Sequence, residues 1–252
     1  MNLFDLSGKI AVVNGASRGI GEAIAKGLAD CGALVVLTSR KQESVQEVAD
    51  EIVESGGKAV AKACHAGRLE EIESLFEFIA NEFGRLDIII NNAATNPFFG
   101  PATDLPPRAF DKTVEINLKG PYYMLSKAVP LMAKSGGGSA VNVASIAALI
   151  SLPGQAVYSM TKAGLISMTR SFAKEYGSQG IRVNAILPGV VETRLASALI
   201  EDSATQKWLS RLPAGRAGQP RDMVAGVLYL VSDQAAYTTG TTLVMDGGAT
   251  LG

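Results

Sequence analysis

Short apolar runs rich in β-branched residues alternate along the chain with longer stretches whose apolar positions recur at helical spacing. The short runs predict seven strands, at residues 10–13, 34–38, 59–63, 86–90, 140–143, 182–187 and 242–245. The longer stretches predict helices at residues 20–29, 44–54, 69–83, 110–133, 155–176 and 221–231.

The central strands are apolar on both faces, as the runs "IAVV", "DIII" and "AVNV" show. Strands of this kind are typical of a parallel sheet that is covered by helices on each side. The alternation of strands and helices predicts an α/β fold with a doubly wound, Rossmann-type sheet. No repeat or linker-like break divides the chain, so we expect one domain over residues 1–252. Ligands of such folds bind at the carboxyl ends of the strands.

Composition removes several classes of function. The chain has 252 residues and a formal net charge of -1, with no basic stripe for nucleic acid. It shows no signal peptide at its start, and no apolar run approaches the roughly 20 residues that span a bilayer. Cys31 and Cys64 are expected to be reduced core residues of a cytoplasmic protein. With His65 as the sole histidine and no paired cysteines, neither a zinc site nor a Ser-His-Asp hydrolase is expected.

The first strand is followed by a glycine-rich turn, "NGASRGIGEAI", in which Gly15, Gly19 and Gly21 open a helix. Glycines allow a tight turn and close backbone approach, and a helix N-terminus offers free N–H groups to a phosphate. The pattern therefore predicts a pyrophosphate site, although a plain glycine-rich turn between strand and helix would also fit it.

The end of the second strand favours a phosphorylated cofactor. A dinucleotide without a 2′-phosphate is usually held there by an Asp or Glu. The sequence instead reads "TSRKQE", with Ser39 and Arg40 and no carboxylate before Glu43. Arg40 and Arg18 could clamp a 2′-phosphate, for which a guanidinium fork is well suited. We therefore predict NADP(H) rather than NAD(H), against the alternative of two solvated surface cations.

A tyrosine and a lysine lie four residues apart in "YSMTKAG", where Tyr158 and Lys162 share one face of a predicted helix. The spacing alone also fits a surface pair. Ser145 ends the fifth strand at "NVAS" and should face the same crevice. In another helix, Pro121 lies four residues after Asn117, so its ring should free the Asn117 carbonyl and kink the helix near Gly120. A free buried carbonyl needs a partner such as water or a cation.

Taken in order, the glycine turn, "NNAA", Asn117, Ser145, the Tyr158–Lys162 pair, "PGVVET" and "DGG" resemble the short-chain dehydrogenase/reductase family over essentially the whole chain. The resemblance implies an oxidoreductase in which Asn117, Ser145, Tyr158 and Lys162 are catalytic. Ser145 would hydrogen-bond the substrate oxygen, and Tyr158 would exchange a proton with it. Lys162 would favour the tyrosinate and bind the nicotinamide ribose, and the Asn117 carbonyl would hold a water that relays protons.

The resemblance also implies the cofactor contacts. They are Gly15, Ser17, Arg18, Gly19, Ile20, Gly21, Ser39, Arg40, His65, Asn91, Ala93, Tyr158, Lys162, Pro188, Gly189, Val191 and Thr193. Three positions depart from the family pattern. Asn14 replaces a usual threonine, Ala94 replaces the last glycine of "NNAG", and His65 stands where many members place an aspartate. These departures concern adenosine binding rather than the catalytic group.

The substrate pocket is expected between residues 95–101, residues 149–155 and a lid segment at residues 190–218. Its predicted wall is apolar and aromatic: Phe98, Phe99, Leu152, Leu195 and Trp208. Each of these could instead be a core or oligomer contact. "SRKQ", "CHAG", "NPFFG" and "SIAAL" resemble the NADPH-dependent carbonyl/retinal reductase branch, which implies reduction of apolar or aromatic ketones, or oxidation of the corresponding alcohols.

Two other functions remain open. A 3-oxoacyl-[acyl-carrier-protein] reductase could use Arg170 and Lys174 to contact its acidic carrier. A dinucleotide-binding regulator without turnover would need no proton donor, which the four catalytic candidates argue against. The family resemblance further implies a homotetramer and a small-molecule substrate, with neither nucleic acid nor membrane as a partner.

Overall fold

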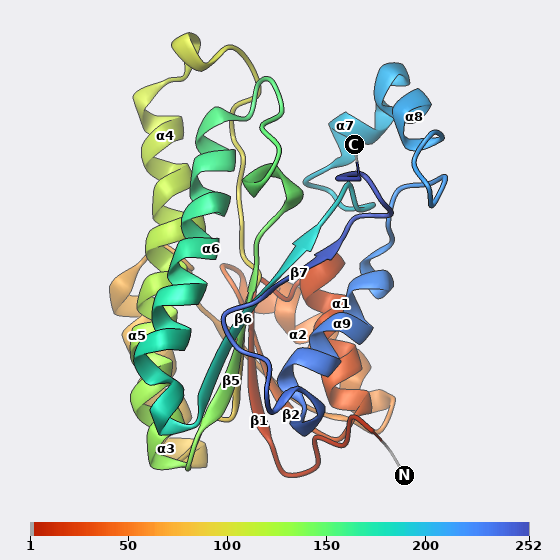
Figure 1. Ribbon diagram of the computed structural model, residues 1–252. Coiled ribbons are helices and arrows are strands. Elements are labelled where there is room, and N and C mark those ends of the chain that lie inside the picture. Colours follow the sequence, from red (N-terminus) through yellow and green to blue (C-terminus); the bar gives the residue numbers. More distant parts are fainter. Residues whose placement is uncertain (1–2, 252) are drawn as a thin grey trace.

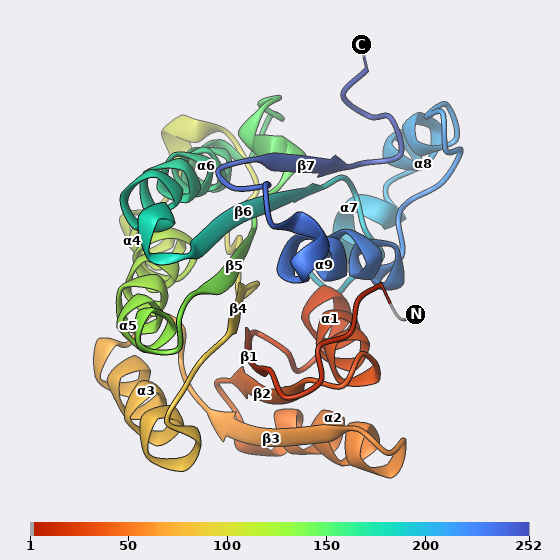
Figure 2. The ribbon, with the colours of Figure 1, turned by 60° about the horizontal axis from the view of Figure 1, so that its bottom comes forward.

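The structure is a computed structural model that describes residues 3–251. Seven parallel strands form one sheet in the order β3-β2-β1-β4-β5-β6-β7 (Figures 1 and 2). The strands are β1 (Ile10–Asn14), β2 (Leu34–Ser39), β3 (Lys58–Ala63), β4 (Ile88–Asn91), β5 (Gly138–Val143), β6 (Ile181–Pro188) and β7 (Thr242–Met245). The predicted doubly wound α/β sheet is confirmed.

The central strands are buried on both faces, which explains their continuous apolar runs. Val12 of β1 lies between Val36 of β2 and Ile89 of β4 in the parallel register. All three side chains are fully buried. At about 25 cal/mol per Å² of buried apolar surface, each such side chain contributes roughly 1.5–3 kcal/mol to folding.

Helices cover both faces of the sheet (Figure 2). One layer contains α1 (Gly19–Asp30), α2 (Gln42–Glu54) and α9 (Val224–Val231). The other contains α3 (Leu69–Phe83), α4 (Pro107–Val114), α5 (Gly120–Lys134) and α6 (Ala156–Tyr176). Separate hydrophobic clusters fill the two interfaces, with Leu28 and Val227 in the first and Ile79 and Met124 in the second.

The long helix predicted at residues 110–133 is interrupted. It runs from Pro107 in α4 to Lys134 in α5, and a π-helical turn, Glu115–Lys119, joins the two parts. The N–H of Gly120 binds the carbonyl of Glu115, five residues back. Gly120 also lies so close to the carbonyl of Ala66 that any Cβ at this position would collide with it. The break predicted from Pro121 thus takes the form of a π turn against the loop that follows β3.

The lid segment at residues 190–218 holds two short helices that the sequence pattern did not predict, α7 (Ser197–Glu201) and α8 (Ser203–Leu209). Its ends are joined, because the N–H of Gly218 donates to Val190 and the N–H of Glu192 donates to Gly218, both at 2.9 Å. The segment is therefore an excursion that leaves and re-enters the fold at one point, beside the carboxyl end of β6 (Figure 1).

The remaining differences lie at element ends. β4 begins at Ile88 rather than at residue 86, because the Asp87 carboxylate accepts hydrogen bonds from the Ile10 N–H and from Arg85. The helix predicted at 221–231 opens as a 3₁₀ turn, Pro220–Met223, with a capping box between Gln219 and Asp222. Within the described residues, none of the helices is long and apolar enough to cross a membrane.

Candidate active site

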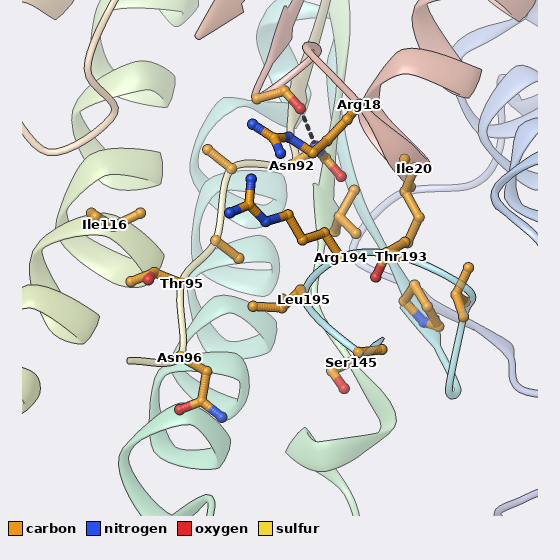
Figure 3. A pocket seen from close by; sticks show the side chains of 18 of the residues that line it. Arg18, Ile20, Asn92, Thr95, Asn96, Ile116, Ser145, Thr193, Arg194 and Leu195 are labelled. Atoms are coloured by element: carbon orange, nitrogen blue, oxygen red, sulfur yellow. Dashed lines mark hydrogen bonds between the residues drawn. The ribbon is translucent and has the colours of Figure 1, made fainter. Parts of the chain in front are cut away.

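One cleft of about 580 Å³ opens at the carboxyl ends of the strands. It is lined by segments that follow β1, β2, β3, β4, β5 and β6, as expected for a sheet whose strands all point the same way. Figure 3 shows Arg18 and Asn92 at one end of this cleft and Ser145 toward the other.

The glycine turn after β1 is held against the loop after β4. Gly15 has a φ of 76°, and a Cβ there would lie 2.7 Å from the Cα of Ala93. The Asn92 side chain donates to the Gly15 carbonyl at 2.8 Å. Gly21 does not line the cleft, because it packs behind the turn against Gly15 and Asn92. Glycine at these two positions thus lets the turn after β1 pack directly against the loop after β4.

The charged residues that line the cleft are all cationic: Arg18, Arg40, Lys162 and Arg194. No Asp or Glu is among the lining residues. Within residues 3–251 the guanidinium groups of Arg18, Arg40 and Arg194 have neither a hydrogen bond nor an ion pair. A cleft of this charge favours an anionic ligand with several negative groups.

His65 lies in the wall formed by the loop after β3. Its ring Nδ1 accepts a hydrogen bond from the Gly67 backbone N–H at 3.1 Å, and the backbone N–H of His65 donates to the Glu71 carboxylate at 2.7 Å. Burial, followed by the charge of Arg68, lowers the pKa of this imidazole. The ring is therefore a neutral one near pH 7, and Nε2 carries its proton.

Asn117 is fully buried and ties three segments together. Its Nδ2 donates to the Thr95 carbonyl at 2.9 Å, and its Oδ1 accepts from the Thr95 N–H at 2.8 Å. Nδ2 also contacts the Thr161 hydroxyl at 3.3 Å, which in turn donates to the Tyr158 carbonyl at 2.7 Å. The side chain of Asn117 thus fixes the loop after β4 relative to α6, although it does not itself line the cleft.

Ser145, Tyr158 and Lys162 all line the cleft. The Ser145 hydroxyl accepts a hydrogen bond from the Ala147 N–H at 3.1 Å. Burial raises the pKa of Tyr158, and a hydrogen bond with Ser145 opposes that rise. The structure thus brings the serine and tyrosine hydroxyls together at one place in the cleft.

Lys162 is 2 % exposed, and its Nζ donates to the Val143 carbonyl at 2.7 Å. Burial lowers the pKa of this ammonium to about 7. The sequence interpretation expected Lys162 to favour the tyrosinate. The effect of burial dominates instead, because it disfavours the charged form of both groups. Tyr158 is therefore protonated at neutral pH.

The other predicted cofactor residues divide into two groups. Asn91 does not line the cleft, because its amide donates to the Oδ1 of Asn142 inside the sheet at 2.9 Å. The rest lie in the lining: Gly15, Ser17, Arg18, Gly19, Ile20, Ser39, Arg40, His65, Ala93, Pro188, Gly189, Val191 and Thr193.

Only part of the predicted substrate wall lies in the cleft. Leu152 and Leu195 line the cleft, but Phe98, Phe99 and Trp208 do not. The Phe99 ring lies against Gly154 and is 61% exposed, and the Phe98 ring lies against Gly100. These two aromatic side chains therefore pack on the rim loops rather than inside the cleft.

The sequence analysis gave the ranges 95–101 and 190–218 but did not single out several polar lining residues, among them Asn92, Asn96 and Arg194. Asn96 directly follows Thr95, the residue that Asn117 holds, and its Oδ1 is buried without a partner. Arg194 follows Thr193 in "VVETR", and its charge was the available signal.

Comparisons with known proteins agree with this site. A family model described as Enoyl-(Acyl carrier protein) reductase matches residues 15–250. Dehydrogenase/reductase SDR family member 4 of Oryctolagus cuniculus is 40% identical over 245 residues, covering 97% of this chain and 94% of that protein.

Two solved structures have the same fold along their length. A short-chain type dehydrogenase/reductase from Mycobacterium marinum has a TM-score of 0.94 at 34% identity, covering 100% of this chain and 99% of that one. A gluconate 5-dehydrogenase from Burkholderia cenocepacia, in complex with NADP and tartrate, has a TM-score of 0.96 at 29% identity, covering 100% and 98%.

Proposed function

Because the chain belongs to the short-chain dehydrogenase/reductase family, we propose that it is an NADP(H)-dependent carbonyl reductase that also oxidises the corresponding alcohols. Its substrates are apolar or aromatic ketones and secondary alcohols. The observation that carries the proposal is a single cleft with Ser145 and Tyr158 at one end and unpaired arginines at the other.

The residues of the cleft fit a phosphorylated dinucleotide. Gly15 lets the turn after β1 pack directly on the backbone of Ala93, and Arg18 and Arg40 have no anion of their own within the described chain. Ser39 ends β2 and Arg40 follows it, at a place where a carboxylate would repel a 2′-phosphate and where the described lining of the cleft has none. The Burkholderia cenocepacia neighbour, whose structure contains NADP, supports the same choice.

When bound, the nicotinamide supplies or accepts the hydride. The chain's own residues handle the oxygen. The Ser145 hydroxyl donates a hydrogen bond to the carbonyl oxygen of the substrate, and Tyr158 donates its phenolic proton to that oxygen as the alcohol forms. The raised pKa of Tyr158 keeps this proton in place at neutral pH. Lys162, with a pKa of about 7, can hold or release a proton next to Tyr158. A proton that Lys162 releases can replace the one that Tyr158 has donated.

The apolar part of the proposal rests on Leu152 and Leu195, which line the cleft together with Ile146 and Leu199. Among the described residues that line the cleft there is no carboxylate to bind the hydroxyl groups of a sugar. Burial of a substrate ring against these side chains stabilises the complex by about 25 cal/mol per Å².

An assay of NADPH oxidation with five substrates tests this function. The panel is acetone, an aryl alkyl ketone, a 1,2-diketone, a sugar ketone and a 3-oxoacyl thioester. We expect the aryl ketone to exceed acetone by roughly 5- to 150-fold in kcat/KM, because one ring contributes about 1–3 kcal/mol. The proposal fails if the thioester or the sugar leads and the aryl ketone is inert. No turnover with any substrate would favour a dinucleotide-binding regulator.

A 3-oxoacyl-[acyl-carrier-protein] reductase is the second candidate, and the description of the matching family model names the same carrier for a different reduction. Arg170 lies in a separate hollow of about 370 Å³ on α6, and Lys174 is exposed on the same helix. An acidic carrier protein could bind there. In that case the thioester would lead the panel, and Arg170→Glu would weaken only the carrier-bound substrate.

We propose a homotetramer in the cytoplasm. Exposed apolar side chains on α5 and α6 support self-association, since Tyr122 is 50% and Met160 is 62% exposed. The free thiols of Cys31 and Cys64 are consistent with a reducing compartment. Light scattering of the purified protein gives the number of subunits directly.

A further inference from the structure

The segment after β6 adds a third guanidinium to the cleft, and nothing in the sequence reasoning assigned it a partner. Arg194 lines the cleft with Arg18 and Arg40. Within residues 3–251 it makes no ion pair and no hydrogen bond through its guanidinium. Arg216, which belongs to the same segment, is by contrast paired with Asp222.

Arg194 is held next to the glycine turn by its neighbour in sequence. The methyl carbon of Thr193 lies 3.2 Å from the position that a Cβ on Gly19 would take. Arg18 directly precedes Gly19, and Arg194 directly follows Thr193. The two arginines therefore flank one close contact between the segment and the start of α1. Figure 3 shows both side chains entering the cleft at the end marked by Asn92, away from Ser145.

This position separates Arg194 from Arg40. Arg40 follows β2, whereas the contact between Thr193 and Gly19 lies beyond the end of β1. β1 and β2 are adjacent strands of the sheet, so the two arginines reach the cleft from different places along it. We expect the two guanidinium groups to contact different parts of an elongated ligand. A ligand with two separate anionic groups, one beside each guanidinium, fits both arginines.

We propose that Arg194 binds the pyrophosphate of the dinucleotide cofactor from the side opposite the N-terminus of α1. This rests on the proposed function, in which a dinucleotide occupies the cleft. The pyrophosphate then lies between the free N–H groups of Gly19 and Ile20 on one side and the Arg194 guanidinium on the other. Because Arg194 belongs to the lid segment, the same contact holds that segment over the cleft.

The contact also links cofactor binding to the substrate wall. Leu195, the next residue, lines the cleft and is half exposed in the ligand-free protein. When the pyrophosphate fixes Arg194, it fixes the backbone of Leu195 as well. Substrate binding should therefore be tighter after the cofactor has bound than before.

The test measures the dissociation constants of NADPH, NADH and adenosine 2′-phosphate by calorimetry. The variants are Arg194→Ala, Arg194→Lys and Arg40→Ala. Arg211→Ala is the matched control, since Arg211 belongs to the same segment, is exposed and does not line the cleft. Thermal unfolding followed by circular dichroism checks that each variant is folded.

We expect Arg194→Ala to weaken NADPH and NADH by the same factor, about 10- to 100-fold, because both carry the pyrophosphate. Adenosine 2′-phosphate lacks a pyrophosphate and should bind this variant as it binds the wild type. Arg194→Lys should lose less, since it keeps the charge but not the fork. Arg40→Ala should weaken NADPH and adenosine 2′-phosphate only, and Arg211→Ala should change nothing.

Three results would overturn the inference. Unchanged affinity of Arg194→Ala for both dinucleotides would show that the guanidinium does not bind the cofactor. A loss confined to NADPH and adenosine 2′-phosphate would place Arg194 on the 2′-phosphate. An equal loss in Arg211→Ala would show a general effect of charge in the segment rather than a contact of Arg194. If the wild-type protein binds neither dinucleotide, the proposed function fails together with this inference, so the two failures are distinguishable.

Discussion

The Nζ of Lys162 lies 5.5 Å from the centroid of the Tyr158 ring, while its hydrogen bond goes to the main chain of Val143 at the end of β5. The lysine therefore lies beside the tyrosine ring but donates its hydrogen bond elsewhere. Burial acts on both groups, raising the pKa of the phenol and lowering that of the ammonium. This pair suits the delivery of a proton to a carbonyl oxygen, because the phenol remains protonated at neutral pH.

Replacement of Tyr158 by phenylalanine removes the proton donor and little else. We expect Tyr158→Phe to lower kcat by roughly 10²–10⁴-fold with an unchanged dissociation constant for NADPH. Steady-state kinetics and calorimetry measure the two quantities. Tyr123→Phe on α5 is the control, since Tyr123 does not line the cleft. Retention of more than about a tenth of the wild-type kcat in Tyr158→Phe would exclude this role.

The lowered pKa of Lys162 makes the stability of the ligand-free protein depend on pH. Between the folded value of about 7 and the ordinary value of 10.5, the unfolded chain binds a proton at this lysine that the folded chain does not. The free energy of unfolding therefore rises with pH across this window, by about 1.4 kcal/mol per pH unit from this group. Below pH 7 Lys162 is protonated in both the folded and the unfolded chain, and its burial then destabilises the folded protein by the full amount.

Lys162→Met removes this titration. We expect the variant to be more stable than the wild type at pH 7, and this advantage should shrink as the pH is raised toward 10. Urea unfolding at several pH values measures the difference, with Lys174→Met on the exposed side of α6 as the control. A difference that stays constant with pH would mean that Lys162 is not held in its neutral form by burial.

Arg40 and Lys41 offer a matched pair of neighbouring cations, of which only Arg40 lines the cleft. Arg40→Ala should raise the KM for NADPH by about 10- to 100-fold and leave that for NADH nearly unchanged, because only NADPH has a 2′-phosphate. Lys41→Ala should change neither value greatly. Wild-type kinetics that prefer NADH over NADPH would contradict the cofactor assignment.

Asn117→Ala removes the side chain that binds both backbone groups of Thr95. The free energy of unfolding should fall by at least about 2 kcal/mol, since each buried polar group left without a partner costs roughly 1–3 kcal/mol. Thr161→Val keeps the bonds between Asn117 and Thr95, and so should lose less. Denaturant unfolding measures the loss of stability in each variant. Equal losses in the two variants would show that the hydrogen bonds to Thr95 are not the main contribution of Asn117 to stability.

A crystal structure at high resolution would test the relay. We expect a water molecule to be hydrogen-bonded to the main-chain carbonyl of Asn117 in the π turn, on the side that faces Lys162. A carbonyl that is instead occupied by a backbone N–H of the helix would rule out the water relay while leaving the side-chain bonds to Thr95 in place.

Leu195→Ala should lower kcat/KM for an aryl ketone by roughly 5- to 30-fold, which corresponds to about 1–2 kcal/mol of lost apolar contact. The value for acetone should change little. Phe99→Ala provides a contrast, because its ring packs on the rim against Gly154. If Phe99→Ala has the larger effect, the substrate binds nearer the rim than the ligand-free cleft indicates.

The sheet could be predicted because its signal is local. The apolar runs at Val12, Val36 and Ile89 reveal strands buried on both faces, and the order of strands and helices then restricts the topology. Element ends were less accurate because they depend on side-chain bonds such as those of Asp87, whose partner Ile10 is 77 residues away. Propensity within a window of residues does not contain such contacts.

The candidate site, too, could be predicted only where its signal is local in the sequence. Proline at position 121 predicted a break in the helix, but not that the Asn117 side chain would hold Thr95, a contact across 22 residues. The prediction of a pocket wall at Phe98 and Phe99 rests on side-chain type alone, because side-chain direction cannot be read from the sequence. In the folded chain Gly154 provides a flat surface for Phe99 outside the cleft.

The two walls of the cleft are anchored in different ways, and this should influence how the protein evolves. Thr95 is fastened to a buried amide in the helical layer, so a change of sequence nearby disturbs the core. The opposite wall is an excursion whose ends meet at Val191 and Gly218. Extra residues inside such a closed excursion cost little conformational entropy, since each doubling of loop length adds only about 0.6 kcal/mol. New substrate ranges should therefore arise by insertion, deletion and replacement between these two residues, while the catalytic side of the cleft is inherited unchanged.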